Sequence, residues 1–534
     1  MLLSKFSSAE KRSLFLRLTC ALIWAAELFW IQKSSFEAVP WIRFPLVIEL
    51  IRLYFDVIFA TTLVLLLRRR WLVPLLIFNF VMLLIVGVYV TYFHRPLMLS
   101  RVFYEFQEAW SLHPMVYDLL PPVITAVLVI AFVAKVALLF RSGDFLAPRT
   151  LRLRLLGVSL LMFLTPLTAL QFTHLRLNVN PNGGLGRIVF AYGYTLPWIC
   201  DSIANRTLDN HTRQAQKILS STYDRLSPVE NPIAVPGHLV LLQLESVGGQ
   251  AIDSYWDTKP VMPFLLGLKN QSLYFRLMSF HFNGTCDMDF ATVTFTEPYP
   301  NLVPYRLPGL KYTNSLPAFM KRHGFKTYVF HGNAALFYDR AAVMGQLGFD
   351  GMFFKEQLAD RGFKSSIIGY RDADVFRCVR EILAESNRAC IFTITLDTHV
   401  PFKQLETQEM EIFPRPETAA QRYLNSLRHL DNCLRDFIGA LPEGTTVVMY
   451  GDHTASLDSR EFKSDVVEGK EYVCCLIYTK GTNLAVHQQT RDLPVATDGS
   501  LNLLDIMSYL RHSIEKAGDI TSTGTALISR PSSP

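Results

Sequence analysis

Hydrophobic and polar residues are distributed differently in the two halves of the chain. Five apolar runs stand out in the first third, at about residues 13–32, 46–67, 72–92, 121–140 and 154–172. Each is close to the ~20 residues that an α-helix needs to cross a bilayer. From His238 onward, short apolar runs alternate with helix-like segments, which is typical of an α/β domain. The pattern therefore predicts five transmembrane helices followed by an α/β domain.

Basic residues between the apolar runs predict the orientation in the membrane. They cluster at 5–12, 68–70 and 141–154, which fall on one side if all five runs span. Positive charge marks the cytoplasmic side. We therefore expect a multi-pass protein of the bacterial cytoplasmic (inner) membrane, with a cytoplasmic N-terminus and everything after about residue 173 outside. The first run is too long, and too poor in a small-residue cleavage site, for a removable signal peptide.

Three ionisable residues interrupt the apolar runs: Glu27, Asp56 and Lys135. Such groups are costly in hydrocarbon unless they pair, reach the interface or face water. One interpretation places them beside a lipid head-group path. The other, which we favour, is that Lys135 extends its amine to the interface and the acids pair with neighbours such as Arg52. The aromatic segment 93–120 is expected to lie in the membrane interface.

Residues 173–235 have a different character. They contain a turn-rich break at 178–184, a polar helix-like segment to about Leu226, and two prolines, Pro232 and Pro236, that close it. We therefore predict a transmembrane domain over 1–172, juxtamembrane linker helices over 173–235 and an outer domain over 236–528.

Composition agrees with a membrane protein and excludes some other classes. Half of the residues are hydrophobic, 18% are charged and the mean hydropathy is +0.22. The net charge of +6 comes without a long basic run, so we expect no nucleic-acid partner. The eight cysteines show no metal-type Cys-x-x-Cys pattern, and their pairing is not assignable. Cysteines outside the membrane favour a periplasmic location for the outer domain.

Polar residues follow four strand-like runs of the outer domain. Glu245 ends the run 238–244, His331 ends 327–330, His399 follows 390–396, and Asp452 with His453 ends 446–450. In open α/β sheets, ligands bind at the carboxyl ends of strands. We therefore expect these side chains to form an active site at one edge of the sheet.

The stretch 281–290 contributes a hydroxyl to the same site. This stretch follows a strand-like run and opens a helix-like segment, and a hydroxyl at a helix N-terminus lies among free backbone N–H groups that favour a phosphate oxyanion. The alternative is that Thr285 merely caps that helix. Together with Glu245, Asp452 and His453, however, it forms a ligand set that suits Mn²⁺ or Zn²⁺. His331, His399 and Arg340 would add proton donors and a guanidinium for phosphate oxygens.

These residues stand in motifs that resemble a known family. The outer domain is similar to the sulfatase/alkaline phosphatase superfamily, and more closely to its branch of lipoteichoic acid synthases and phosphoethanolamine transferases. The motifs are Leu244-Glu245-Ser246, Gly284-Thr285-Cys286-Asp287, the segment from Phe330-His331-Gly332-Asn333 to Phe337-Tyr338-Asp339-Arg340, Thr395 to Phe402, and Tyr450-Gly451-Asp452-His453. The resemblance covers essentially the whole chain. It implies an α/β/α domain with a central mixed sheet.

The resemblance also implies roles for individual residues. Glu245, Thr285, Asp452 and His453 would bind one divalent metal ion, with Mn²⁺ favoured and Zn²⁺ as the alternative. Thr285 would be the nucleophile, and His331, Tyr338, Arg340 and His399 would bind the head group. The family's synthases carry Trp at the position of Tyr338 and Ser at that of Cys286. The Cys-x-Pro-x-Arg context of true sulfatases is missing around Cys286, which disfavours sulfate-ester hydrolysis.

The resulting hypothesis is transfer of phosphoglycerol from a phospholipid to a glycan or glycolipid acceptor. Phosphoethanolamine transfer is the alternative, and it would require a carboxylate for the ammonium group, for which Asp287, Asp289 and Asp397 are candidates. A hydrolase of the same fold and a membrane sensor with a degenerate site are further alternatives. The sensor predicts loss of a metal ligand, and none of the four is lost. The sequence does not indicate the oligomeric state.

Overall fold

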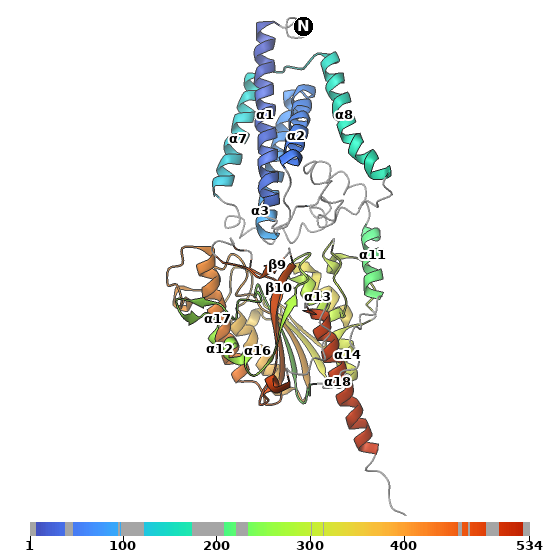
Figure 1. The fold of residues 1–534 in the computed structure, drawn as a ribbon, viewed down its shortest axis with the longest axis vertical. Helices are drawn as coiled ribbons and strands as arrows, with labels where there is room; N and C mark the ends of the chain where they lie inside the picture. The colour runs from blue at the N-terminus through green and yellow to red at the C-terminus, as the bar shows by residue number, and fades with distance from the viewer. Residues whose placement is uncertain are drawn as a thin grey trace, which may run out of the picture. The chain divides into compact units, whose positions relative to one another are not determined.

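The chain forms two compact units, Met1–Thr207 and Leu208–Pro534, which are described separately below. The structure is a computed structural model, drawn in Figure 1. The residues that it describes are 7–37, 46–93, 97, 122–172, 208–220, 233–300, 302–312, 314–455, 457, 462–467, 470–487 and 501–526. Most of the expected aromatic segment 93–120 and of the linker 173–235 lies outside this set.

All five apolar runs of the first unit form helices. These are α1 (Ser8–Glu37), α2 (Leu46–Leu66), α3 (Arg69–Phe93), α7 (Pro122–Arg141) and α8 (Arg149–Phe172). Within the described residues, three segments are long and apolar enough to cross a membrane, namely Ser8–Ile31, Arg69–Tyr89 and Pro122–Arg141. The first three turns of α2 carry the charged residues Glu49, Arg52 and Asp56.

Lys135 and Glu27 form a buried ion pair inside the first unit. The Lys135 ammonium on α7 donates to Glu27 Oε2 on α1, and the same oxygen lies 3.4 Å from Asn79 Nδ2 on α3. Both charged side chains are almost fully buried. The expected extension of Lys135 to the interface is therefore wrong. A carboxylate on a neighbouring helix neutralises the amine at lower cost than a long reach to water.

The second unit is built on a mixed β-sheet. Its strand order is β11-β4-β10-β8-β1-β7-β5-β6, and β9 pairs with β10 beside this path. The strands are β1 (Leu239–Leu244), β4 (Leu273–Met278), β5 (Lys326–His331), β6 (Gly351–Phe353), β7 (Ala389–Ile394), β8 (Thr446–Gly451), β9 (Val466–Val467), β10 (Lys470–Thr479) and β11 (Leu501–Asn502). A separate hairpin joins β2 (Tyr255–Trp256) to β3 (Lys259–Pro260).

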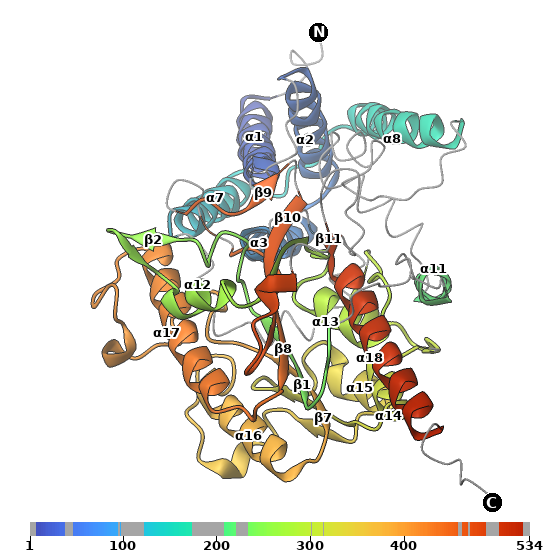
Figure 2. The same ribbon diagram turned by 60° about the horizontal axis from the view of Figure 1, so that its bottom comes forward.

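Helices cover both faces of this sheet (Figure 2). One face carries α12 (Pro263–Lys269), α16 (Asp372–Glu385) and α17 (Ala419–Gly439). The other carries α13 (Cys286–Thr294), α14 (Leu316–Arg322), α15 (Arg340–Leu347) and α18 (Leu503–Ala526), and α11 (Leu208–Ser220) also belongs to this unit. In α17, a capping box between Thr418 and Gln421 fixes the first turn, and apolar residues such as Leu427 and Leu434 pack into the core. The predicted α/β/α layers are confirmed.

The four strands predicted to carry site residues are neighbours in the sheet. β8, β1, β7 and β5 are all parallel, with Leu244 opposite Gly451 and His331 opposite Ile394. They are buried strands, as their continuous apolar runs predict. Because parallel neighbours end at the same edge, the residues that follow them are brought together there.

The Lys135–Glu27 pair yields a stability prediction for the first unit. Lys135→Met leaves the Glu27 carboxylate buried without its cation, and we expect this to destabilise the unit by about 3–5 kcal/mol. Unfolding by SDS in mixed micelles measures the change. The double variant Lys135→Met/Glu27→Gln removes both charges and should recover most of the loss. A double variant as unstable as the single one would contradict a charge-based explanation.

Candidate active site

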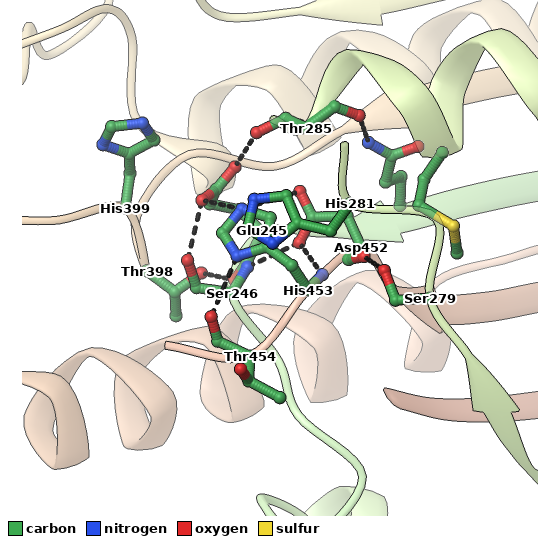
Figure 3. A network of polar contacts seen from close by, with 12 residues as sticks. Glu245, Ser246, Ser279, His281, Thr285, Thr398, His399, Asp452, His453 and Thr454 are labelled. Carbon is green, nitrogen blue, oxygen red and sulfur yellow. Dashed lines mark hydrogen bonds and ion pairs between the residues drawn. The ribbon is translucent and has the colours of Figure 1, made fainter. Parts of the chain in front are cut away.

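Two acids and a histidine meet at the carboxyl ends of β1 and β8 (Figure 3). His453 Nε2 lies 3.3 Å from Glu245 Oε1 and 3.6 Å from Asp452 Oδ2. One ligand atom from each of the three residues lies within 4.8 Å of the other two, and the carboxyl groups are buried. This is the spacing of groups that can share one metal ion.

Thr285 faces the same cluster from the start of α13. It occupies the position before the first helical residue, but its side chain makes no capping hydrogen bond. Instead, Thr285 Oγ1 donates to Glu245 Oε2 over 3.1 Å (Figure 3). The alternative in which Thr285 only caps the helix is therefore wrong. Its backbone oxygen accepts a 3.1 Å bond from the buried amide of Gln243 on β1.

The electrostatics of this cluster suit a cation. Burial and the neighbouring Glu245 raise the pKa of Asp452 well above its usual value. Burial alone would raise the pKa of Glu245, but the imidazoles of His399 and His453 hold it well below its usual value. Asp452 Oδ2 is buried and accepts no hydrogen bond in the described part of the chain. A divalent cation would satisfy that oxygen, so the residues present fit a metal.

Several residues that hold this cluster were missed at the sequence level. Ser246 Oγ donates to Glu245 Oε1 (2.7 Å), and its backbone N–H donates to Asp452 Oδ1 (2.8 Å). Ser246 has φ 56°, a left-handed conformation that lets one residue contact both acids. Thr395 Oγ1 accepts from the backbone N–H of Glu245 (2.9 Å), and Thr398 Oγ1 donates to the backbone carbonyl oxygen of Glu245. Both threonines lie inside the motif from Thr395 to Phe402, and that motif is the sequence feature that could have indicated them.

His281 and Glu471 support the cluster from a second side. The His281 ring stacks on that of His453 with centroids 4.2 Å apart, and its Nδ1 lies 2.8 Å from Glu471 Oε1. Glu471 Oε2 accepts from the N–H and hydroxyl of Thr454. Glu471 lies 190 residues from His281, on β10, which pairs with β4, β8 and β9. No local pattern marks such a contact.

Arg340 and His331 form an adjacent buried group. Arg340 Nε donates to Asp289 Oδ2 (2.6 Å), and its NH1 lies 3.3 Å from His331 Nε2. His331 Nδ1 donates to the Ile394 oxygen (3.1 Å), so its Nε2 is left to accept from the guanidinium. Burial, and then the charge of Arg340, lower the pKa of His331 to about 3. The Tyr338 ring packs 5.0 Å from the Arg340 guanidinium and is itself largely buried.

His399 lies on the loop that follows β7 and within electrostatic reach of Glu245 and His331. Figure 3 shows its ring beside the Glu245–Thr285 pair rather than between them. Its Nδ1 lies 2.6 Å from the Val400 oxygen. Asp397 anchors the loop by accepting from Arg371 Nε (2.8 Å), while Asp372 accepts from the N–H groups of residues 396 and 397. Every predicted site residue thus lies at this edge.

Asp287, Asp289 and Asp397, the candidate partners for an ammonium group, are all bonded to groups of the protein. All three are fully buried. Asp287 accepts from the N–H groups of Phe282 and Asn283 and from the Asn283 amide. Asp289 and Asp397 pair with Arg340 and Arg371. Each of the three acids therefore contacts groups of the protein, and Asp289 Oδ1 accepts no hydrogen bond among the described residues.

The arrangement combines a hydroxyl beside a cation site with a guanidinium and two imidazoles. This set can activate an oxygen nucleophile and stabilise the oxyanion charge of a phosphate or sulfate ester. Esters of this kind are the substrates that such a site suits.

Comparison with solved structures agrees with the fold. An integral membrane lipooligosaccharide phosphoethanolamine transferase A from Neisseria meningitidis is similar over 95% of this chain and 96% of its own, with a TM-score of 0.56 and 14% identity. A phosphoglycerol transferase from Streptococcus pyogenes, solved with sn-glycerol-1-phosphate, matches 59% of this chain and 93% of its own (TM-score 0.41, 18% identity). The first likeness extends over both units of the chain.

Sequence comparison places the second unit in a family. The lipoteichoic acid synthase of Staphylococcus aureus (strain USA300) is 26% identical over 273 residues, which are 46% of this chain. The match spans 42% of the length of that relative. The family model described as Sulfatase matches residues 238–505, a range that begins just before β1 and contains Glu245, Thr285, Asp452 and His453. The chain therefore belongs to the sulfatase family.

Proposed function

We propose that the chain is a membrane phosphotransferase that moves phosphoglycerol from phosphatidylglycerol to a hydroxyl of a glycan or glycolipid acceptor. The observation that carries this proposal is the Thr285 hydroxyl, which donates to Glu245 at a site that two buried acids and His453 make suitable for a cation. The phosphoglycerol transferase and lipoteichoic acid synthase among the similar proteins support the class of reaction.

The site would hold one divalent metal ion through Glu245, Thr285, Asp452 and His453. Mn²⁺ is favoured and Zn²⁺ is the alternative, because carboxylate, hydroxyl and imidazole ligands suit both. Once bound, the ion would lower the pKa of the Thr285 hydroxyl and offset negative charge on the phosphate.

The reaction proceeds in two displacements. Thr285 Oγ1, having lost its proton to solvent, attacks phosphorus, and the bond from phosphorus to the oxygen of diacylglycerol breaks. The leaving oxygen takes a proton from a nearby acid. The acceptor hydroxyl then attacks the phosphothreonine, gives its proton back to that acid, and releases Thr285, which regains a proton. Both displacements occur at the same phosphorus, so one set of donors serves both.

His399 is the proposed proton donor. His331 has a pKa of about 3, so it is neutral at pH 7 and accepts from Arg340 rather than donating a proton. His399 lies on the loop that follows β7, within electrostatic reach of Glu245, and its Nδ1 is directed at the Val400 oxygen. His331 and Arg340 are assigned to the phosphate and head group, with Tyr338 packed against the guanidinium to hold it in place.

Phosphoglycerol is favoured over phosphoethanolamine by the commitments of the acids. An ammonium head group requires a carboxylate, and Asp287, Asp289 and Asp397 are all buried and bonded within the protein. A glycerol head group needs only hydrogen-bonding partners. Phosphoethanolamine transfer remains the alternative because the phosphoethanolamine transferase shares the fold over nearly the whole chain.

The membrane arrangement completes the proposal. Five helices of the first unit would span the cytoplasmic membrane of a bacterium, with the N-terminus inside and the catalytic domain, residues 236–528, outside. Three of these helices meet the length and composition of a membrane span. Residues 173–235 would link the two domains. Tethering would hold the site near the lipid head groups and raise the local concentration of the donor.

Thr285→Ala tests the nucleophile. The wild-type chain incubated with phosphatidylglycerol should gain the mass of one phosphoglycerol group on Thr285, and the variant should gain none because no oxygen remains at that position. Intact-mass analysis followed by peptide mapping measures both. Thr285→Ser, which keeps a hydroxyl, is the matched control and should still form the adduct. An adduct on Thr285→Ala would rule out this nucleophile, and an adduct formed only with phosphatidylethanolamine would select the alternative donor.

Asp452→Asn tests the metal site. The substitution keeps the shape but removes the charge that faces the cation, and we expect the affinity for Mn²⁺ to fall at least about tenfold. Metal titration by calorimetry, followed by metal analysis after dialysis, provides the measurement. Asp465→Asn, at an acid that pairs with Arg276 instead, is the control and should bind as the wild type does. Equal metal content in the wild type and Asp452→Asn would sink the site model.

The choice of proton donor is tested with the leaving group. His399→Asn should slow transfer from the phospholipid by about 10²–10⁴-fold, because an alkoxide must leave without a proton. With a p-nitrophenyl ester of glycerol phosphate, whose leaving group needs no proton, the loss should be small. His331→Asn is the comparison and should slow both substrates alike. Equal losses on both substrates for His399→Asn would remove it as the donor.

A further inference from the structure

Helix α11, which opens the second unit, contacts a residue close to the Thr285 loop. His211 Nδ1 lies 2.7 Å from the Tyr299 hydroxyl, and the same hydroxyl lies 3.1 Å from Gln214 Oε1. His211 and Tyr299 are buried, and their rings meet edge to face. Buried hydrogen bonds of this kind are costly to lose, because the groups left behind have no water to replace them.

The donors and acceptors in this contact can be assigned. The Gln214 Oε1 atom only accepts, so the single hydroxyl proton of Tyr299 is directed to it. The Tyr299 oxygen then accepts from His211, which places the His211 proton on Nδ1. Each group uses the role that its chemistry allows, and the ring of Tyr299 is thereby fixed by two residues one turn apart on α11.

The backbone of Tyr299 continues the connection to the site. Its carbonyl oxygen accepts from Asn283 Nδ2 (2.8 Å), and the second hydrogen of that amide goes to Asp287 Oδ1 (2.8 Å). Asp287 Oδ2 accepts from the N–H groups of Phe282 and Asn283. All the hydrogens of the Asn283 amide are therefore used, at a side chain that is 1% exposed.

These bonds set the backbone that directly precedes Thr285. Gly284, between Asn283 and Thr285, has φ +116°, which a residue with a side chain rarely adopts. A loop with such a residue relies on its neighbours for a defined path. Asn283 and Asp287 define that path on either side of Gly284 and Thr285, so a shift of Tyr299 would reach Thr285 Oγ1.

We infer that Tyr299, held by α11, is a positioning residue for the Thr285 nucleophile. The inference rests on the proposed function for the role of Thr285. Helix α11, which lies within the predicted linker 173–235, thus fastens the nucleophile loop through a route of three residues, Tyr299, Asn283 and Asp287. The route from Tyr299 to the loop runs through its carbonyl oxygen, which accepts from the Asn283 amide.

Another contact of α11 provides a matched control. Gln216, on the same helix, donates from Nε2 to the Lys311 oxygen (3.1 Å) and accepts from the Lys311 N–H (2.8 Å). This pair also fastens α11 to the unit, but it leads to the chain after Tyr305 and not to Asn283. Gln216→Ala therefore loosens the helix without cutting the route through Tyr299.

Hydrogen exchange of the full chain in nanodiscs measures the loop without any activity assay. Tyr299→Phe and His211→Leu should speed exchange at the amides of Phe282 and Asn283 about threefold or more, whereas Gln216→Ala should leave them unchanged. His211→Asn, whose amide can replace Nδ1 as the donor, should restore slow exchange. Unchanged exchange in Tyr299→Phe, or an equal increase in Gln216→Ala, would overturn the inference.

Kinetics separate positioning from a general structural role. Tyr299→Phe should lower kcat for phosphoglycerol transfer about threefold to tenfold, with KM for the lipid changed less than about twofold and Mn²⁺ affinity retained. Faster loop exchange with wild-type kcat would also overturn the inference. Failure of the proposed function has a different signature, because the wild type would then show no transfer while the exchange pattern among the four variants persisted.

Discussion

The repulsion between two buried carboxylates, Glu245 and Asp452, is the constraint on which the site depends. They follow β1 and β8, parallel neighbours whose ends are in register at Leu244 and Gly451, so the sheet forces them together. Two buried like charges are unfavourable unless positive charge lies between them. Burial alone would lower the pKa of His453, but these two acids raise it well above its usual value, which shows how strongly the pair attracts positive charge. The Thr285 hydroxyl donates to Glu245, and a cation held by these residues would offset the remaining negative charge.

Two buried ion pairs, each formed by an arginine and an aspartate, hold the residues that surround this cluster. Arg340–Asp289 fixes the guanidinium beside His331, and Arg371–Asp397 fixes the loop that carries His399. Both pairs are buried, so breaking either would leave a charge without water or partner. Arg340 NH2 has no hydrogen-bond partner among the described residues, so its two N–H donors could serve an oxyanion. Asp289 and Asp397 thus orient the two arginines, and these ion pairs engage their carboxylates within the protein.

The sequence predicted the parts of the site that local patterns encode. The buried strands β1, β5, β7 and β8 appear as apolar runs, and because they are parallel their following residues had to converge. Contacts that join distant segments could not be predicted. Glu27 pairs with Lys135 on another helix, Asp397 pairs with Arg371, and His281 contacts Glu471 on β10. Each of these partners depends on which charged residue the tertiary packing brings near. The sequence alone does not show how loops and helix faces pack against one another.

Cys286 and Tyr338 are the two positions at which this chain departs from the pattern of the synthases, and both side chains are buried beside the candidate site. The Cys286 side chain is fully buried at the start of α13, so its thiol has no access to the phosphate that Thr285 would face. Tyr338, in a left-handed conformation at φ 60°, presents its ring to Arg340 and exposes little of itself. The ring that packs against Arg340 is thus a Tyr phenol, which is smaller than a Trp indole. If Arg340 meets the head group as proposed, a small change in the support of its guanidinium would shift which head group fits.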